Sequence, residues 1–437
     1  MEKQQHTKIM AFIIVMAVIV CGQQGVEAMP MRLTLEQSIE RALEFNPVVY
    51  QGLAQVEGAK AKLNQAQANF GPQLSFSATA APTSSVTGLP PLIPLQTVQY
   101  NYYENEFQLS LPLYSGGKLE NQLDQQHAEV TVSEKNLSNT KEQLVLDTTL
   151  TYINVLESQK LLALTQESYD NTNKHLHNVK ERFVVGVAIR TDILRSEVEL
   201  ANITQDLIKA RNACKLNLLT LNSLLKLPLA TELELPDIVG SDIITTPSVS
   251  VDECVKTALA IHPQLIGGKA GIASARYAFE ASKSGRRPTL TLFGYYDWAE
   301  SDRFPPHGDN WQVGLSMNFN VLDSGLIKGQ VRQSKATLEE TEARYQKLQD
   351  DMVLEVQQAW FNLMEAKERS VAAQMVLEKA QEDYHMAEER YEVGVGTNID
   401  VLDAQEALVK SRTNYIQSEY DVVRDQAKLS KAVGKRL

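Results

Sequence analysis

Few residues in this chain have the types and spacing that catalysis or metal binding would need. His175 and His177 lie two apart in a helical pattern and point to different faces, which disfavours a shared metal site. Asp350 and Asp351 are adjacent acids of the kind that marks a solvated helix face. The Gly394-Val-Gly396 segment is too short to be a dinucleotide-binding loop. The sequence holds no phosphate-binding loop, GxSxG elbow or HExxH motif. We therefore expect no enzyme activity, no cofactor and no metal site.

Composition and cysteine usage exclude some classes of partner and fold. The formal net charge is −12, from 42 basic and 54 acidic residues, and no basic patch interleaved with aromatic residues is present. Such a chain is poorly suited to neutralising phosphates, so no nucleic-acid partner is expected. Cys214 and Cys254 stand singly in helical patterns, which gives neither a disulfide framework nor a zinc site.

Residues 1–28 have the pattern of a secretory signal peptide. Two lysines precede an apolar run over residues 9–20, and small and polar residues follow up to Ala28, where we expect cleavage. A lipoprotein signal with Cys21 acylated is the alternative, although Val20 is a poor fit before such a cysteine. The apolar run is shorter than the roughly 20 residues that a transmembrane helix requires.

Two long stretches without glycine or proline dominate the mature chain, at residues 118–185 and 330–393. At about 1.5 Å of rise per residue, a helix of this length reaches roughly 100 Å. The two stretches end alike, in RFVVGVAIRTDILRSEVEL at 182–200 and RYEVGVGTNIDVLDAQEAL at 390–408. The chain is therefore an internal duplication, and each copy is expected to span a distance rather than fold into a compact domain.

The duplication predicts two repeats with the same order of elements. Each begins with a capping-box pattern, contains a strand hairpin and a long helix, and ends with a helix that returns after a glycine turn. We expect a first repeat at 29–226, with a hairpin at 72–114, a long helix at 118–185 and a returning helix at 190–226. An inter-repeat linker at 227–249 is expected to fold against the helices at mid-height. We expect a second repeat at 250–437, with a hairpin at 288–321, a long helix at 330–393 and a returning helix at 398–432.

The predicted hairpins alternate apolar and polar residues with a period of two. Strands of about 10 residues have the length that a tilted strand needs to cross a bilayer. The segments at 82–101 and 301–310 are expected to be solvent loops, because both contain several prolines or polar residues. A soluble sandwich would show the same alternation. Lipid, however, does not tolerate an open sheet edge, so four membrane strands would have to close by oligomerising, and three copies give twelve strands.

One motif occurs at both turns, R-[FY]-x-x-G-x-x-x-x-x-D-[IV]-L at 182–194 and 390–402. Together with the signal peptide and the duplicated order of elements, it resembles the TolC-type outer-membrane efflux protein family, also called outer membrane factors. The resemblance covers essentially the whole mature chain.

This resemblance implies a mainly α fold with a small β part, assembled as a homotrimer. A twelve-stranded β-barrel would lie in outer-membrane lipid and continue as a periplasmic twelve-helix α-barrel. The implied function is a passive exit duct for tripartite efflux or type I secretion. Its implied partners are a periplasmic adaptor (membrane fusion) protein, which docks on the helical tips, and an inner-membrane pump of the RND, ABC or MFS type. The implied location is the cell outer membrane, extending into the periplasm.

The resemblance also assigns roles to residues at the two turns. It implies adaptor docking at the tips, formed by Gly186, Val187, Ala188, Gly394, Val395 and Gly396. It implies a periplasmic entrance or aperture near Thr191, Asp192, Tyr391, Asp400 and Asp403. Glycines at a helix end also permit positive φ, a local role that is compatible with docking. In an example of the family that this chain resembles, a basic residue at the position of Gly396 ties the closed state, so the resemblance leaves the details of that lock open here.

Asp400 and Asp403 are three apart and therefore share one helix face. Three protomers would bring six carboxylates around one axis, which predicts an acidic, cation-selective ring at the closed entrance. The alternative is that acids near a helix start are favoured by the helix dipole, at about 0.3 to 1 kcal/mol each, which suits Asp192 and Asp400 better than Asp403.

A secreted or periplasmic coiled-coil fibre or adaptor without a pore is the other function class. A fibre would show sustained a/d heptads and no membrane-length hairpins. The long stretches here are rich in Ala, Gln, Asn and Ser with only sparse Leu and Val, which favours the duct. A polar, unselective lumen predicts no particular cargo among drugs, metal ions and proteins.

Overall fold

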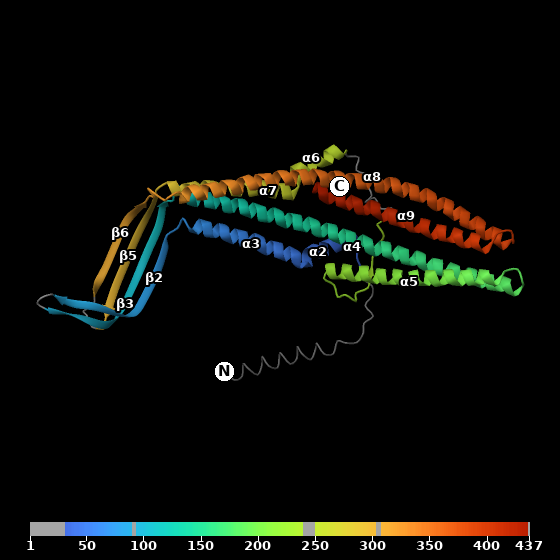
Figure 1. Cartoon of the computed structure of the whole chain (residues 1–437), viewed down its shortest axis with the longest axis horizontal. Coiled ribbons are helices and arrows are strands. Elements are labelled where there is room, and N and C mark those ends of the chain that lie inside the picture. The colour runs from blue at the N-terminus through green and yellow to red at the C-terminus, as the bar shows by residue number, and fades with distance from the viewer. Residues whose placement is uncertain (1–30, 90–92, 239–249, 303–306, 436–437) are drawn as a thin grey trace, which may run out of the picture.

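The computed structural model describes residues 31–89, 93–238, 250–302 and 307–435. The expected signal peptide at 1–28, with Cys21, lies outside these residues. The molecule is elongated, with a sheet at one end and two helical hairpin tips at the other (Figure 1). It is mainly α-helical with a small β part, as predicted.

The two repeats have the same order of elements. The first contains α2 (Leu35–Phe45), α3 (Pro47–Ala68), β2 (Gln73–Leu89), β3 (Ile93–Tyr114), α4 (Lys118–Val184) and α5 (Arg190–Leu224). The second contains α6 (Val251–Ile261), α7 (Pro263–Lys283), the 3₁₀ turn η1 (Ser284–Arg286), β5 (Thr289–Ser301), β6 (His307–Asn318), α8 (Leu326–Glu392) and α9 (Asn398–Val433). Two short strands, β1 (Met31–Arg32) and β4 (Leu233–Glu234), pair in parallel beside the helices.

Helix starts follow the capping chemistry of the sequence. Thr34 and Ser250 each accept a hydrogen bond from the backbone three residues on and complete a capping box, one in each repeat. Helix α8 begins at Leu326, four residues before the expected start at 330. Asp323 accepts hydrogen bonds from the backbone nitrogens of Gly325 and Ile327, at 3.0 and 2.8 Å, and these bonds start the helix before Gly329. A single interior glycine costs only about 1 kcal/mol, which a helix of this length tolerates.

The four long strands form one antiparallel sheet in the order β2-β3-β5-β6, so the two repeats meet where β3 pairs with β5. The strands β2 and β3 are longer than expected, at 17 and 22 residues. The prediction of a solvent loop at 82–101 was wrong for most of that segment, since Pro82 pairs with Asn101 and the ladder continues to Thr87 and Gln96. Proline is tolerated here because β2 is an edge strand. Strand β6 ends at Asn318, short of the expected 321.

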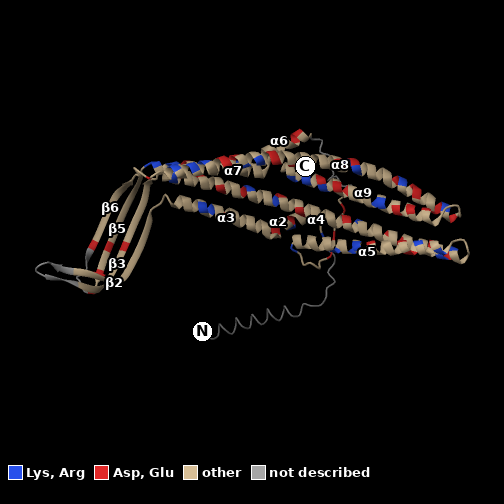
Figure 2. Cartoon of the chain, in the orientation of Figure 1, with Lys and Arg blue, Asp and Glu red and all other residues tan. Residues whose placement is uncertain are grey.

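The sheet separates apolar from polar side chains. One row across the four strands is Phe76, Phe107, Tyr296 and Trp311, and the next row, on the opposite face, is Ser75, Gln108, Tyr295 and Gln312. Within β2, β3, β5 and β6 the charged residues are all acidic, whereas both signs are scattered along the helices (Figure 2). Trp311 is 72% exposed in the single chain, so no described residue covers the apolar face at this position.

The helices form a single curved layer. Near the sheet, α3 packs on α4, α4 on α7, and α7 on α8; towards the tips, α5 packs on α4, α4 on α9, and α9 on α8. One edge of the layer is therefore α3 and α5, and the other edge is α8. Among the described residues, no helix is both long enough and apolar enough to span a membrane.

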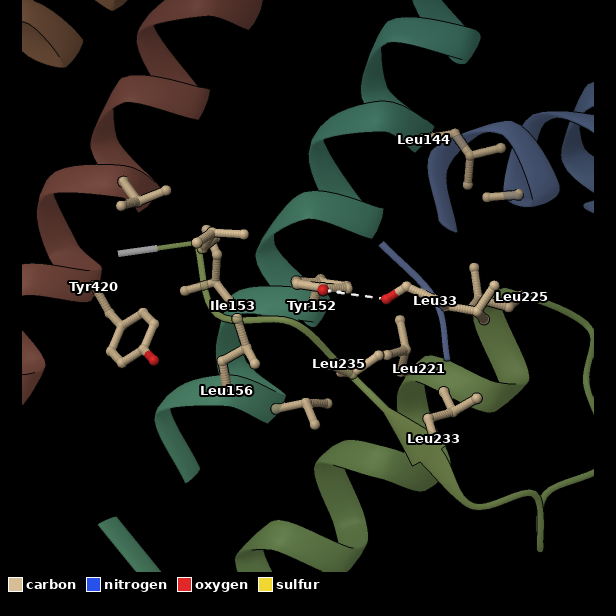
Figure 3. Packing of buried hydrophobic residues seen from close by; sticks show 14 of the residues in the cluster. Leu33, Leu144, Tyr152, Ile153, Leu156, Leu221, Leu225, Leu233, Leu235 and Tyr420 are labelled. Carbon is tan, nitrogen blue, oxygen red and sulfur yellow. Dashed lines mark hydrogen bonds between the residues drawn. The ribbon is translucent and has the colours of Figure 1, made fainter. Parts of the chain in front are cut away.

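A hydrophobic cluster at mid-height joins the two repeats (Figure 3). Tyr152 of α4 is 0% exposed, and its hydroxyl donates to the carbonyls of Pro236 at 2.9 Å and Leu33 at 3.2 Å. Leu233 and Tyr420 belong to the same cluster, so the described part of the inter-repeat linker packs against the helices, as expected. Burial raises the pKa of Tyr152 to about 12, because an ionised phenolate would be poorly solvated there.

Candidate functional site: the helical tips

The two tip turns have the same backbone geometry. Gly186 and Gly394 both have φ of +82°, in the left-handed region that favours glycine. The nitrogen of Val187 donates to Arg182 O, and that of Val395 to Arg390 O, both at 2.9 Å. Space is not the constraint at the two glycines, since a Cβ on either would meet no atom within 4 Å.

The tips present apolar side chains to solvent. Val187 is 68% exposed and Val395 is 69% exposed. Neighbouring exposed residues extend this surface, namely Val184, Val185, Ile189 and Val393. The residues predicted for docking thus lie on two separate hairpins at the same end of the molecule (Figure 1).

The third tip position differs between the repeats. Ala188 occupies it in the first repeat and is partly buried. A Cβ at the equivalent Gly396 would come within 3.0 Å of Tyr391 N and 3.1 Å of Arg390 C. The backbone of Arg390 and Tyr391 therefore leaves little room for a side chain at position 396.

The predicted entrance acids have unequal local roles. Asp400 completes a capping box, since Thr397 N donates to its Oδ2 at 2.9 Å and its own nitrogen donates to Thr397 Oγ1 at 3.3 Å. These hydrogen bonds hold the pKa of Asp400 below its usual range. Asp192 makes half of the same arrangement, accepting from Ile189 N at 3.3 Å. Asp403 is exposed and takes no part in the cap. Helix capping therefore accounts for Asp400 and Asp192 but not for Asp403.

Tyr391 lies between the two hairpins. Its ring is flanked by the guanidinium of Arg182, 4.5 Å from the centroid, and by His175, whose centroid is 5.5 Å away. Burial raises the pKa of Tyr391. Its hydroxyl is buried and forms no hydrogen bond within the described residues. Thr191 is exposed at the start of α5.

Arg182 joins α4 to the end of α8. Its two terminal nitrogens donate to the carbonyls of Tyr391 at 2.8 Å and Glu392 at 2.9 Å. These carbonyls belong to the last turn of α8, where a helix leaves acceptors unsatisfied and its dipole favours a cation. The motif singled out Arg182, but its cross-repeat partners are backbone atoms that no local pattern identifies.

Asn398, the first residue of α9, is a site residue that the sequence reasoning missed. It is 3% exposed and contacts His175, Ser196 and the Asp192 carbonyl. The available signal was the break in repeat symmetry, since Arg190 occupies the equivalent position in the first repeat.

Further polar contacts continue along the seam between α4 and α9. Gln405 donates to Thr172 at 2.6 Å, and Arg412 donates to Glu167 at 2.8 Å. Towards mid-height, Arg424 pairs with Glu157 at 2.6 Å. Hydrogen bonds and ion pairs therefore add to the apolar cluster of Val179, Tyr391 and Val401 in holding the tip-side halves of the two repeats together.

This geometry defines a class of protein: a duplicated protomer in which a two-faced sheet with open edges continues into one long curved layer of helices. The comparisons identify its family. The model of the outer membrane efflux protein family matches residues 38–225 and 254–435. The chain belongs to this family, whose members are channels and not enzymes.

Relatives and solved structures agree with this assignment. The outer membrane efflux protein BepC of Brucella suis is 25% identical over 338 residues, covering 75% of this chain and 71% of the relative. The outer membrane protein TolC of Escherichia coli is 21% identical over 426 residues, covering 94% and 84%. The outer-membrane channel OprN has a TM-score of 0.80 at 18% identity, covering 92% and 89%, and VceC of Vibrio cholerae has 0.80 at 17%, covering 92% and 96%. The predicted efflux family and outer-membrane location are thus confirmed.

Proposed function

We propose that this protein is the trimeric exit duct of a tripartite efflux pump or type I secretion system, conducting substrates passively from the periplasmic side to the exterior. The observation that carries the proposal is the sheet. Among the described strands, the outer edges of β2 and β6 are unpaired, and one face of the sheet is apolar while the other is polar. A lipid environment requires such edges to pair and such a face to be covered.

Pairing β6 of one copy with β2 of the next would satisfy both edges. The contact is head-to-tail, so it generates a ring, and three copies of four strands close a barrel of twelve. The apolar face would meet lipid and the polar face would line the lumen. The acidic residues Glu104, Glu106 and Asp297 belong to the polar face by register, which suits a water-filled interior.

The helical layer supports the same assembly. Its two edges carry exposed apolar side chains, including Tyr50 and Ile208 on α3 and α5, and Phe361 and Met375 on α8. Exposed apolar surface of this kind marks an interaction site. Placing α8 of one copy against α3 and α5 of the next would continue the barrel as a ring of twelve helices. The fibre alternative does not account for the sheet.

The tips are the proposed docking site for a periplasmic adaptor, which in turn links the duct to an inner-membrane pump of the RND, ABC or MFS type. Exposed valines around Gly186 and Gly394 support this, because a helix end in solvent has no local need for them. The entrance acids Asp400 and Asp403 are proposed to form the cation-selective ring, with Asp403 free of any capping duty.

Reconstitution tests the proposal directly. Protein extracted from outer membranes with detergent should be trimeric and should form channels in planar bilayers. Monomers that remain soluble in the periplasmic fraction without detergent would contradict it.

A further inference from the structure

Three exposed cations lie where the second repeat passes from the sheet into its helices. Arg286 belongs to η1, and Lys328 and Arg332 belong to the first two turns of α8. Lysine and arginine are frequent at this end of α7 and α8 (Figure 2). Within the described residues, none of the three is in an ion pair. Together they form what we call the basic surface.

The three cations are neighbours because η1 packs on the start of α8. A Cβ on Gly285 would meet the side chain of Ile327 at 3.2 Å. Arg286 and Lys328 directly follow these two residues. Arg332 lies four residues after Lys328 and therefore shares its helix face. The turn and the helix thus bring the three side chains to one place.

The acids around the basic surface already have partners. Hydrogen bonds from the backbone nitrogens of Ile327 and Gly325 lower the pKa of Asp323, and the charge of Arg286 lowers it further. The neighbouring acids of α7 and α8 each pair with a lysine of their own helix, Glu280 with Lys283 and Glu339 with Lys335. Three cations therefore remain beside one ionised carboxylate, and the surface is positive.

The basic surface lies on the outer side of the helical layer. On α7, Gly267 meets α4 and Gly268 meets α8, so the two neighbouring helices contact positions only about 100° apart. In the proposed ring of helices the narrower angle between neighbours faces the lumen, so the opposite side of α7 faces outwards. Arg276 lies on that opposite side and pairs with Glu342 of α8 at 3.9 Å. By helical spacing, Glu342 is on the same face of α8 as Lys328.

The first repeat lacks this surface. The repeats align at the prolines that precede β2 and β5, Pro72 and Pro288, and again at the N-caps of the long helices, Gly117 and Gly325. The first-repeat equivalents of the three cations are Phe70 for Arg286, Glu120 for Lys328 and Asp124 for Arg332. A general need of the passage from strand to helix would have placed cations in both repeats. The fold therefore does not explain the basic surface.

We propose that the basic surface binds the phosphate of anionic phospholipids in the inner leaflet of the outer membrane. This rests on the proposed function, in which the sheet spans the membrane and the helices extend into the periplasm. The end of the sheet then lies at the level of the lipid headgroups, and cations there attract anionic lipids.

The sheet supplies the apolar half of such a site. Leu315 and Met317 of β6 belong to the apolar face and are 62% and 71% exposed. They lie on the membrane side of the basic surface, where acyl chains would contact them while the phosphate meets the cations. A free phosphate ion would gain nothing from these apolar side chains, so the arrangement favours a lipid.

Native mass spectrometry of the detergent-extracted trimer tests this, with phosphatidylglycerol and phosphatidylcholine of the same acyl chains titrated in turn. The wild type should retain phosphatidylglycerol preferentially. Arg286→Gln combined with Lys328→Gln and Arg332→Gln should bind phosphatidylglycerol at least about tenfold more weakly, because each cation near an anionic lipid surface contributes about fivefold. Its binding of phosphatidylcholine should not change. Excess inorganic phosphate should not displace the lipid from the wild type.

Arg344→Gln combined with Lys347→Gln and Lys379→Gln is the matched control. It removes the same charge from exposed side chains further along α8 and should keep the lipid preference. Equal retention of the two lipids by the wild type, or an unchanged preference in the first triple variant, would overturn the lipid site and leave the duct intact. Loss of the preference in the control variant, or displacement of the lipid by inorganic phosphate, would do the same. Wild-type protein that is monomeric or forms no channels would instead overturn the proposed function, and the lipid site with it.

Discussion

The guanidinium of Arg182 on α4 donates to the carbonyls of Tyr391 and Glu392 at the end of α8 and covers the Tyr391 ring. Two residues that the duplication places at nearly equivalent turns thus hold the two hairpins of one chain together. In a duct this contact would have to break when the entrance opens.

We predict that Arg182→Ala raises open probability and leaves trimer and membrane insertion intact. The variant loses two hydrogen bonds from a charged donor, each worth about 1.5 to 3 kcal/mol. Arg182→Lys should show an intermediate effect, because an ammonium cannot form the same two-pronged contact. Lys180→Ala is the control, because Lys180 pairs with Glu197 within the helical hairpin of α4 and α5. This variant should leave conductance unchanged. Unaltered gating in Arg182→Ala would show that this contact does not hold the entrance closed.

Charged residues at the tip turns should abolish transport without disrupting the trimer. Gly186→Asp and Gly394→Asp introduce charge into an exposed apolar surface that we propose is covered by the adaptor. The positive φ at both positions adds strain that aspartate and asparagine share. Gly186→Asn and Gly394→Asn are the matched controls, because asparagine has the same size and adopts this conformation without charge. Normal efflux in the Asp variants would show that docking occurs elsewhere.

Neutralising the entrance acids should reduce cation preference. Asp400→Asn combined with Asp403→Asn removes the charges and keeps side chains that can still accept hydrogen bonds, so the helix start is disturbed less than by alanine. Reversal potentials across a salt gradient in planar bilayers measure the effect. Because Asp400 also caps α9, Asp403→Asn alone is the cleaner variant. If cation preference and block by multivalent cations persist in the double variant, these acids serve only the helix.

Stability at mid-height should fall in alkali because of Tyr152. Its pKa is raised to about 12 in the folded protein, against about 10 in an unfolded chain. The stabilisation that neutral Tyr152 gives the folded state is fully present below about pH 10 and is lost as the pH rises through the pKa of the folded protein. Burial also raises the pKa of Tyr420, so part of the sensitivity will remain without Tyr152.

Tyr152→Phe should reduce the alkaline sensitivity and lower stability at neutral pH. The variant leaves the carbonyls of Leu33 and Pro236 without this donor, at a cost of about 1 to 3 kcal/mol. Thermal unfolding of the detergent-extracted protein measures both effects. An unchanged melting temperature at neutral pH would mean that water replaces the hydroxyl.

Much of the fold followed from local signals. The long helix α4 ends at Val184, one residue from the expected end, because Gly186 permits the left-handed turn that stops it. Capping boxes at Thr34 and Ser250 marked the starts of the short helices α2 and α6, because their hydrogen bonds join residues only three apart. The two repeats could be aligned from the sequence because their turns share a motif.

The wrong and missed predictions have a common physical cause: the contacts that decide them join residues far apart in the sequence. Pro82 indicated a loop, and only the position of β2 at the sheet edge makes proline acceptable there. Asn398 and Arg182 gain their roles from atoms some two hundred residues away. Periodicity and turn chemistry specify elements, whereas tertiary packing decides which polar groups meet between them.

The most direct test of the central claim is the native mass of the protein extracted from outer membranes, measured in detergent. Closure of the open sheet edges by neighbouring copies predicts a single species of three chains that inserts into planar bilayers as one conducting unit. A monomeric species, or one recovered in soluble form from the periplasm without detergent, would contradict the barrel and the duct together.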